Sequence, residues 1–146
     1  MRKEFVIRGQ TAKGVTETLN FGKYKAGYAY RLVEFKLASS TNVGVLDAHM
    51  TGVITAGKTP LDPQNPNFND DGLIASAHMK NDANDAYPIS SYSVINDTYI
   101  ITQNLLLTVF NNESHPINWQ CRFESVKMTG AEEAAVNYKQ FAISDE

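Results

Sequence analysis

The chain has a single cysteine, Cys121, among its 146 residues, so no internal disulfide can staple it and its stability must come from packing. No stretch approaches the roughly 18 uninterrupted apolar residues of a membrane span. The start, MRKEFVIRGQ, turns polar after Ile7 and lacks the apolar core of a signal peptide. These absences predict a soluble protein made in the cytoplasm, and the length suits one domain.

Motifs of the common enzyme classes are also missing. The three histidines, His49, His78 and His115, are scattered and lack the HxH or HExxH spacing of many metal enzymes. No serine occupies a nucleophile elbow, and no glycine-rich loop precedes a helix to hold phosphate. Glu34 and Glu124 are isolated carboxylates on predicted strands, whereas a glycosidase needs two facing each other across a cleft. We therefore expect no catalysis.

Period-two alternation of apolar and polar residues runs through much of the chain, as in half-buried strands. It predicts strands over residues 15–21, 31–37, 43–56 and 117–128. A short strand over residues 73–79 should follow the turn pair Asp71-Gly72, and the apolar run within residues 99–110 predicts a strand buried on both faces. Val33 and Phe35 should share a buried face, and Gly52 suggests a bulge or bend in its strand. On the last strand Cys121 lies on one face with Trp119 and Phe123, which favours a small buried hydrophobe over a nucleophile.

Turn-rich segments separate these strands, so the pattern predicts six to eight strands in all. The expected fold class is all-β, a single-domain antiparallel β-sandwich or jelly roll over residues 1–146. One short C-terminal helix should begin at Thr129, because Thr129 and Glu132 have the spacing of a capping box.

The most polar segment is DPQNPNFNDDG, residues 62–72. From Asn67 onward, Asn67, Asn69, Asp71 and Gly72 match the start of an EF-hand loop. Counted from Asn67, however, the twelfth position holds His78 instead of a bidentate glutamate, and no helices flank the segment. An irregular calcium site remains open, with five candidate ligands: Asp62, Asn67, Asn69, Asp70 and Asp71. The same residue types are also the usual ones of plain turns. Because long loops are disproportionately functional, we favour a contact surface in which Phe68 is the apolar anchor.

Charge is unevenly distributed along the chain. Residues 1–36 carry eight basic and three acidic residues, which leaves +5 there and −8 in the remainder of a chain whose net charge is −3. A basic surface could meet nucleic acid or an acidic neighbour, including another copy of the protein. Lysines on exposed strand edges would explain the same charge, because they discourage unwanted strand pairing.

The stretch YIITQNLLLTVFNNESHPINWQCRFESVKMTGAEEA combines a long strand, an Asn-rich turn, a Trp-bearing strand and an acidic helix start. In this layout the chain resembles the small jelly-roll virion proteins of bacteriophages: capsid, minor capsid, decoration or spike components. The resemblance implies a structural role in a virion, with the protein made in the host cytoplasm. It also implies homo-oligomers and contacts with other virion proteins through loops and strand edges, without catalysis or cofactor.

A carbohydrate-binding module is the alternative hypothesis. In that case the Asp/Asn-rich loops would hold calcium, and exposed tyrosine rings would stack on sugars. Tyr24, Tyr28 and Tyr30 lie among basic residues, and Tyr87, Tyr92 and Tyr99 follow the polar loop. Tyrosine is also enriched in protein interfaces, so these rings do not decide between the two functions.

Overall fold

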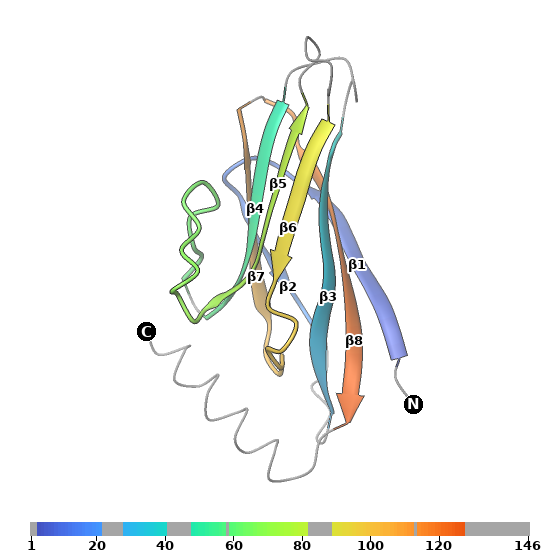
Figure 1. The fold of residues 1–146 in the computed structure, drawn as a ribbon. Helices are drawn as coiled ribbons and strands as arrows, with labels where there is room; N and C mark the ends of the chain where they lie inside the picture. Colours follow the sequence, from blue (N-terminus) through green and yellow to red (C-terminus); the bar gives the residue numbers. More distant parts are fainter. Residues whose placement is uncertain are drawn as a thin grey trace.

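The computed structural model describes residues 3–21, 28–40, 48–57, 59–81, 89–112 and 114–127. These residues form eight strands and no helix, which confirms the all-β prediction. The strands are β1 (Lys3–Thr11), β2 (Thr16–Leu19), β3 (Tyr28–Ser39), β4 (Ala48–Ala56), β5 (Leu73–Asn81), β6 (Ile89–Ile95), β7 (Leu105–Asn111) and β8 (Ile117–Lys127). They form a three-stranded sheet, ordered β1-β8-β3, and a five-stranded sheet, ordered β2-β7-β4-β5-β6 (Figure 1).

The strand pairs are nested within one another along the chain. β1 pairs with β8, β2 with β7, and β4 with β5, all antiparallel. Two further pairs, β3 with β8 and β4 with β7, extend each sheet. β6 pairs with β5 and runs beside β3, and residues of both strands line a common crevice between the two sheets.

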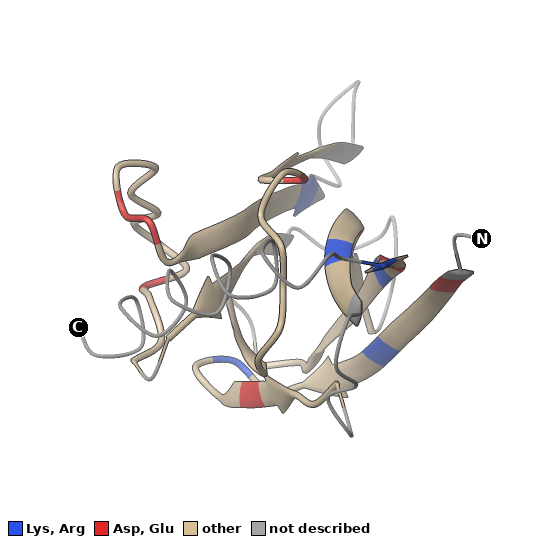
Figure 2. Ribbon diagram, turned by 90° about the horizontal axis from the view of Figure 1, so that it is seen from below, with Lys and Arg blue, Asp and Glu red and all other residues tan. Residues whose placement is uncertain are grey.

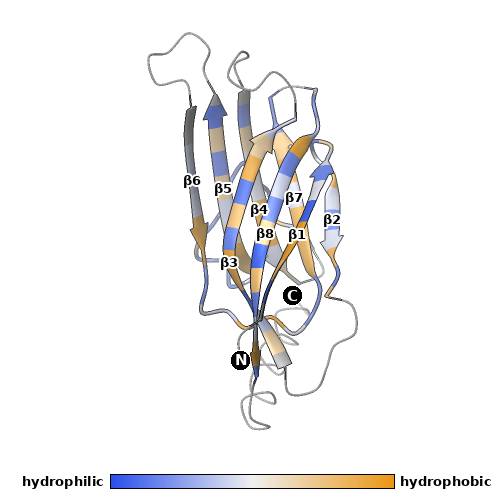
Figure 3. Cartoon of the chain, turned by 90° about the vertical axis from the view of Figure 1, so that its right-hand side faces the viewer, coloured by the Kyte–Doolittle hydropathy of each residue, from blue (hydrophilic) through white to orange (hydrophobic). Residues whose placement is uncertain are grey.

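The core lies between the two sheets and is built by alternation. Along β8, Trp119, Cys121 and Phe123 are buried, whereas the intervening polar residues are half-buried on the other face; Figure 3 shows the alternating hydropathy. Cys121 is fully buried, which confirms the predicted burial of this side chain, and burial raises the pKa of its thiol. Phe123 packs against Phe5 and Phe21, with ring centroids 5.5 and 4.9 Å apart.

Two glycines on inner faces let large side chains approach the backbone. A Cβ at Gly9 would lie 2.9 Å from Cζ2 of Trp119, whose Nε1 donates a hydrogen bond to Oγ1 of Thr11 at 2.9 Å. A Cβ at Gly52 would lie 3.1 Å from Cζ of Phe35. The expected bulge at Gly52 is therefore wrong, because this glycine makes room for the opposite sheet. The register shift of β4 lies between Ile54 and Thr55.

A second irregularity changes which residues of β3 face the core. The register with β8 shifts between Leu32 and Glu34. As a result Leu32 and Phe35 are fully buried, whereas Val33 is half-buried. The prediction that Val33 and Phe35 share a buried face is therefore wrong. A bulge inserts one extra residue and breaks the two-residue period that the prediction assumed.

Other predictions from the sequence missed whole strands or placed the start of a strand too early. β1 and β6 were not predicted at all. The strand expected over residues 99–110 begins only at Leu105; before it, Ile101 forms a single bridge with Tyr30 through backbone hydrogen bonds of 2.7 and 2.9 Å. The strand expected over residues 15–21 begins at Thr16, and Val15 before it is 44% exposed. The predicted helix from Thr129 lies outside the described residues.

Candidate contact surface and pocket

The loop of residues 59–72 joins β4 to β5 and runs back along the outer face of the five-stranded sheet, the face directed away from the core. The backbone N–H of Leu61 donates to Oγ1 of Thr55 on that face, at 3.3 Å, and Pro63 is buried. Near its other end, the N–H of Leu73 donates to the carbonyl of Asp70 at 3.1 Å. The sheet therefore holds the loop at both ends.

Asparagine and aspartate side chains shape the loop through local turns. Oδ1 of Asp62 accepts from the N–H of Gln64 at 2.9 Å, and its Oδ2 accepts from Nδ2 of Asn65 at 2.8 Å. These two bonds, the side-chain bond first, lower the pKa of the Asp62 carboxyl. Two further bonds follow the same two-residue pattern: Asn67 Oδ1 accepts from the N–H of Asn69, and Asp70 Oδ1 accepts from that of Gly72.

The five candidate calcium ligands, Asp62, Asn67, Asn69, Asp70 and Asp71, thus have unequal roles. Three of them place a side-chain oxygen in the turns just described. Within the part of the chain that the structure describes, no three histidine, cysteine or carboxylate side chains gather where they could hold a metal ion. This geometry favours the interpretation of the loop as a series of turns.

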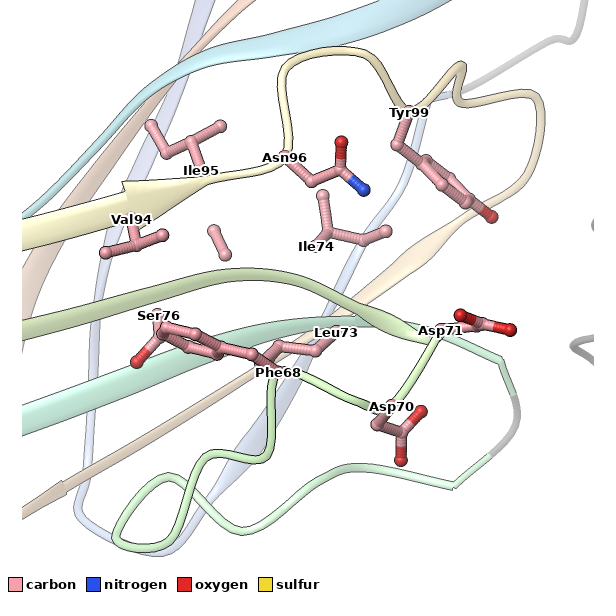
Figure 4. A pocket seen from close by; sticks show the side chains of 11 residues that line it. Phe68, Asp70, Asp71, Leu73, Ile74, Ser76, Val94, Ile95, Asn96 and Tyr99 are labelled. Carbon is pink, nitrogen blue, oxygen red and sulfur yellow. The ribbon is translucent and has the colours of Figure 1, made fainter.

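A pocket of about 280 Å³ lies where this loop meets the lower end of β5 and the turn after β6 (Figure 4). Three of the residues singled out from the sequence line it: Phe68, Asp70 and Asp71. The others come from β5, β6 and the following turn: Leu73, Ile74, Ala75, Ser76, Val94, Ile95, Asn96 and Tyr99. Asp62, Asn67 and Asn69 are not among them, so the structure separates the sequence candidates into two groups.

The pocket is bordered by exposed apolar side chains. Phe68 is 63% exposed and lies beside Ser76 and Val94 (Figure 4). Val94 is 46% exposed and Tyr92 is 53% exposed, and both stand on the outer face of β6 opposite Ser76 and His78. We call Phe68, Tyr92 and Val94 the β6 surface. It adjoins an edge of the five-stranded sheet, because β6 is the last strand of that sheet among the described residues.

Tyr99 lines the same pocket but is 6% exposed, and its hydroxyl is buried without a hydrogen-bond partner. Burial raises the pKa of this phenol to about 12. The sequence placed Tyr99 on a strand and gave no sign of this environment, because the turn that carries it is fixed by contacts with distant residues. One of them is the bond from the N–H of Asn96 to the carbonyl of Ile74, at 2.8 Å.

The two carboxylates considered for glycosidase chemistry lie on the outer face of the three-stranded sheet, and neither is isolated. Glu124 is bonded to Arg31 at 2.9 Å. Glu34 lies 3.8 Å from Nζ of Lys36 and 3.9 Å from Nη1 of Arg122. These pairs also neutralise part of the basic N-terminal stretch. Figure 2 shows acidic residues on the polar loop and basic residues mainly on strands.

The histidines are not brought together as a group of three. His49 is exposed, and His115 lies in the bend before Pro116. His78 lies on β5, half-buried beside Tyr92, with the two ring centroids 5.5 Å apart.

Comparison with known proteins finds no matching family model and no curated protein with significant similarity to this chain. No helix in the described part of the chain is long and apolar enough to cross a membrane.

Proposed function

We propose that the protein is a non-catalytic structural subunit that self-assembles into homo-oligomers and serves as a virion component. It would be made in the host cytoplasm, and its other partners would be further virion proteins. The observation that carries this proposal is the β6 surface, three exposed apolar side chains beside an edge of a sheet. Aromatic residues in such positions are typical of protein interfaces.

The strand pairing supports a jelly-roll form of the β-sandwich. A jelly roll arises when one long antiparallel ribbon folds over on itself, so that the first strand pairs with the eighth, the second with the seventh, the third with the sixth and the fourth with the fifth. Three of these pairs are hydrogen-bonded here, and β6 runs beside β3 while bonding to β5. Viral capsid proteins and lectins both use this fold, so the fold alone does not choose between them.

The polar loop supports assembly more than sugar binding. In a calcium-dependent carbohydrate module, the loop oxygens would be directed at a cation. Here oxygens of Asp62, Asn67 and Asp70 accept hydrogen bonds within the loop instead. These turns present Phe68 to solvent at the mouth of the pocket. An exposed ring on a fixed loop suits a contact, because little conformational freedom is lost on binding.

Replacement of Phe68 by Ala tests the proposal. Because the ring is mostly exposed, we expect the free energy of unfolding to change by less than about 0.5 kcal/mol. Assembly should weaken markedly, because apolar anchors carry much of an interface's binding energy. The measurement is solution mass by size exclusion with light scattering, over a concentration series, with and without calcium.

Val6→Ala is the matched control, because Val6 is 47% exposed on the outer face of the other sheet. It should leave both assembly and stability unchanged. A wild-type protein that is monomeric at every concentration would contradict self-assembly. A melting temperature that rises with calcium would instead favour the carbohydrate-binding module. Loss of assembly in Val6→Ala as well as in Phe68→Ala would place the contact elsewhere.

A further inference from the structure

Two histidines from different strands meet on the outer face of the five-stranded sheet. His49 on β4 and His78 on β5 are diagonal neighbours, since Thr51 pairs with His78 and His49 pairs with Lys80. Their ring centroids lie 6.4 Å apart, and the ring planes are inclined by 64°. His49 is exposed and His78 is half-buried, so solvent reaches the pair. Neither residue takes part in the proposed assembly contact.

We propose that His49 and His78 form a binding site for a divalent transition-metal cation of the Zn²⁺, Ni²⁺ or Cu²⁺ class. Imidazole nitrogen suits these ions, whereas calcium and magnesium prefer oxygen ligands. In the described part of the chain no third histidine, cysteine or carboxylate joins the pair. Two imidazoles fill two positions of such a site, and metal sites of this kind can leave a position open for water.

The separation of the rings is close to what a shared metal requires. A metal–nitrogen bond of about 2.0–2.1 Å places the ion roughly 3.2 Å from the centre of each ligating ring. Two rings on a tetrahedral ion would then have centroids about 5.2 Å apart. The observed 6.4 Å exceeds this by roughly 1.2 Å. Because His49 is exposed, a rotation of its side chain within its rotamer well can supply that movement.

The surroundings keep one ligand fixed and favour its neutral form. The ring of Tyr92 on β6 stacks on His78, with a 29° angle between the planes, and restricts its rotation. Desolvation, then the neighbouring His49 and Lys80, lower the pKa of His78.

The positive charge beside the two histidines provides a test that is specific to this site. Lys80 on β5 is paired with His49 across the two strands, and Tyr92 on β6 stacks on His78. Nζ of Lys13 lies 6.0 Å from the ring centroid of Phe110 on β7. The ammonium group of Lys80 opposes a divalent cation by like-charge repulsion. Removing that charge should therefore strengthen metal binding, an effect that an unrelated site elsewhere would not show.

Isothermal titration calorimetry tests the proposal. Ni²⁺ is titrated into protein without a histidine tag at pH 7.5. We expect one ion per chain. His49→Ala and His78→Ala should each weaken binding at least about tenfold, because loss of even an outer-shell partner costs 10–100-fold. Lys80→Gln should strengthen binding, and His115→Ala should leave it unchanged.

The imidazole signals in nuclear magnetic resonance spectra provide a second readout that does not depend on the alanine variants being folded. Added Zn²⁺ should shift the ring signals of His49 and His78 together and leave that of His115 in place. Equal affinity in wild type and in either His49→Ala or His78→Ala would overturn the proposal, because a single imidazole would then account for the binding. So would the absence of any Ni²⁺ binding to the wild-type protein.

Discussion

The outer faces of the two sheets expose different kinds of side chain to solvent. On the three-stranded sheet, charged side chains pair between β3 and β8, with Glu124 bonded to Arg31 and Glu34 lying near Arg122. Glu34 also lies near Lys36 on its own strand. On the five-stranded sheet, the corner formed by β5, β6 and the polar loop exposes the three apolar side chains of the β6 surface.

This difference in exposed side chains affects association with other surfaces more than it affects the free energy of unfolding. The exposed ion pairs of Glu34 contribute little to the free energy of unfolding, but charged side chains on a sheet discourage indiscriminate association. Apolar side chains left exposed next to a strand edge have the opposite effect, because they favour contact with another surface. The chain thus carries one face suited to remaining in water and one suited to being covered, and this contrast can be tested by substitution.

Truncation of a ring under the paired face should have the largest effect. Phe123 is fully buried and packs against two other aromatic rings, so Phe123→Ala should destabilise the protein by about 3–5 kcal/mol. Tyr92→Ala removes a ring of similar size from the β6 surface and should cost less than about 1 kcal/mol. Urea unfolding at equilibrium measures both. Similar losses in the two variants would show that the β6 surface is part of the fold's core packing.

An added methyl group in the three-stranded sheet should have an intermediate effect. A Cβ at Gly9 would come within 2.9 Å of the Trp119 ring, whose Nε1 is bonded to Thr11. Since the ring cannot move without straining that bond, Gly9→Ala should cost about 1–3 kcal/mol. Its neighbour on the outer face provides the control: Arg8→Ala should shift the melting temperature little. An unchanged melting temperature in Gly9→Ala would mean that the sheet yields at this point.

Gly9 also shows why β1 escaped prediction. The strand alternates, with Phe5 and Ile7 facing inward, but its inward position 9 is glycine and its outward position 6 is valine, so the apolar period is lost. In β6 the pattern is inverted, because serines face the core side while Tyr92 and Val94 face solvent. By contrast β8 keeps a strict alternation around Trp119, and its sequence alone predicted it.

The candidate site was predictable only in part, for a related reason. Composition marked residues 62–72 as a functional loop, and Phe68, Asp70 and Asp71 do line the pocket. Which loop residues reach the pocket depends on where the loop is held against Thr55, and this is a contact of the folded sheet. The partners of the pocket, from β6 and the turn at Tyr99, are distant in sequence, so no local pattern could reveal them.

The smallest effect is expected at Tyr99, which lines the pocket beside the β6 surface. Its buried hydroxyl has no hydrogen-bond partner, so Tyr99→Phe removes an uncompensated polar group and should stabilise the protein by about 1 kcal/mol near pH 7. Urea unfolding near neutral pH measures this gain. A loss of stability there would mean that the hydroxyl has a partner in solution.

The pH dependence follows from the phenol's pKa, which is about 12 in the folded protein against an ordinary value of 10.0. A raised pKa means that folding favours the protonated phenol. This contribution to stability is fully present below pH 10 and is lost as the pH rises toward 12. Wild-type protein should therefore lose stability over that interval more steeply than Tyr99→Phe, as measured by urea unfolding at several alkaline pH values. Parallel pH curves for the two proteins would contradict burial of the ionisable hydroxyl and would make Tyr99 an accessible part of the pocket, available to any partner that covers the β6 surface.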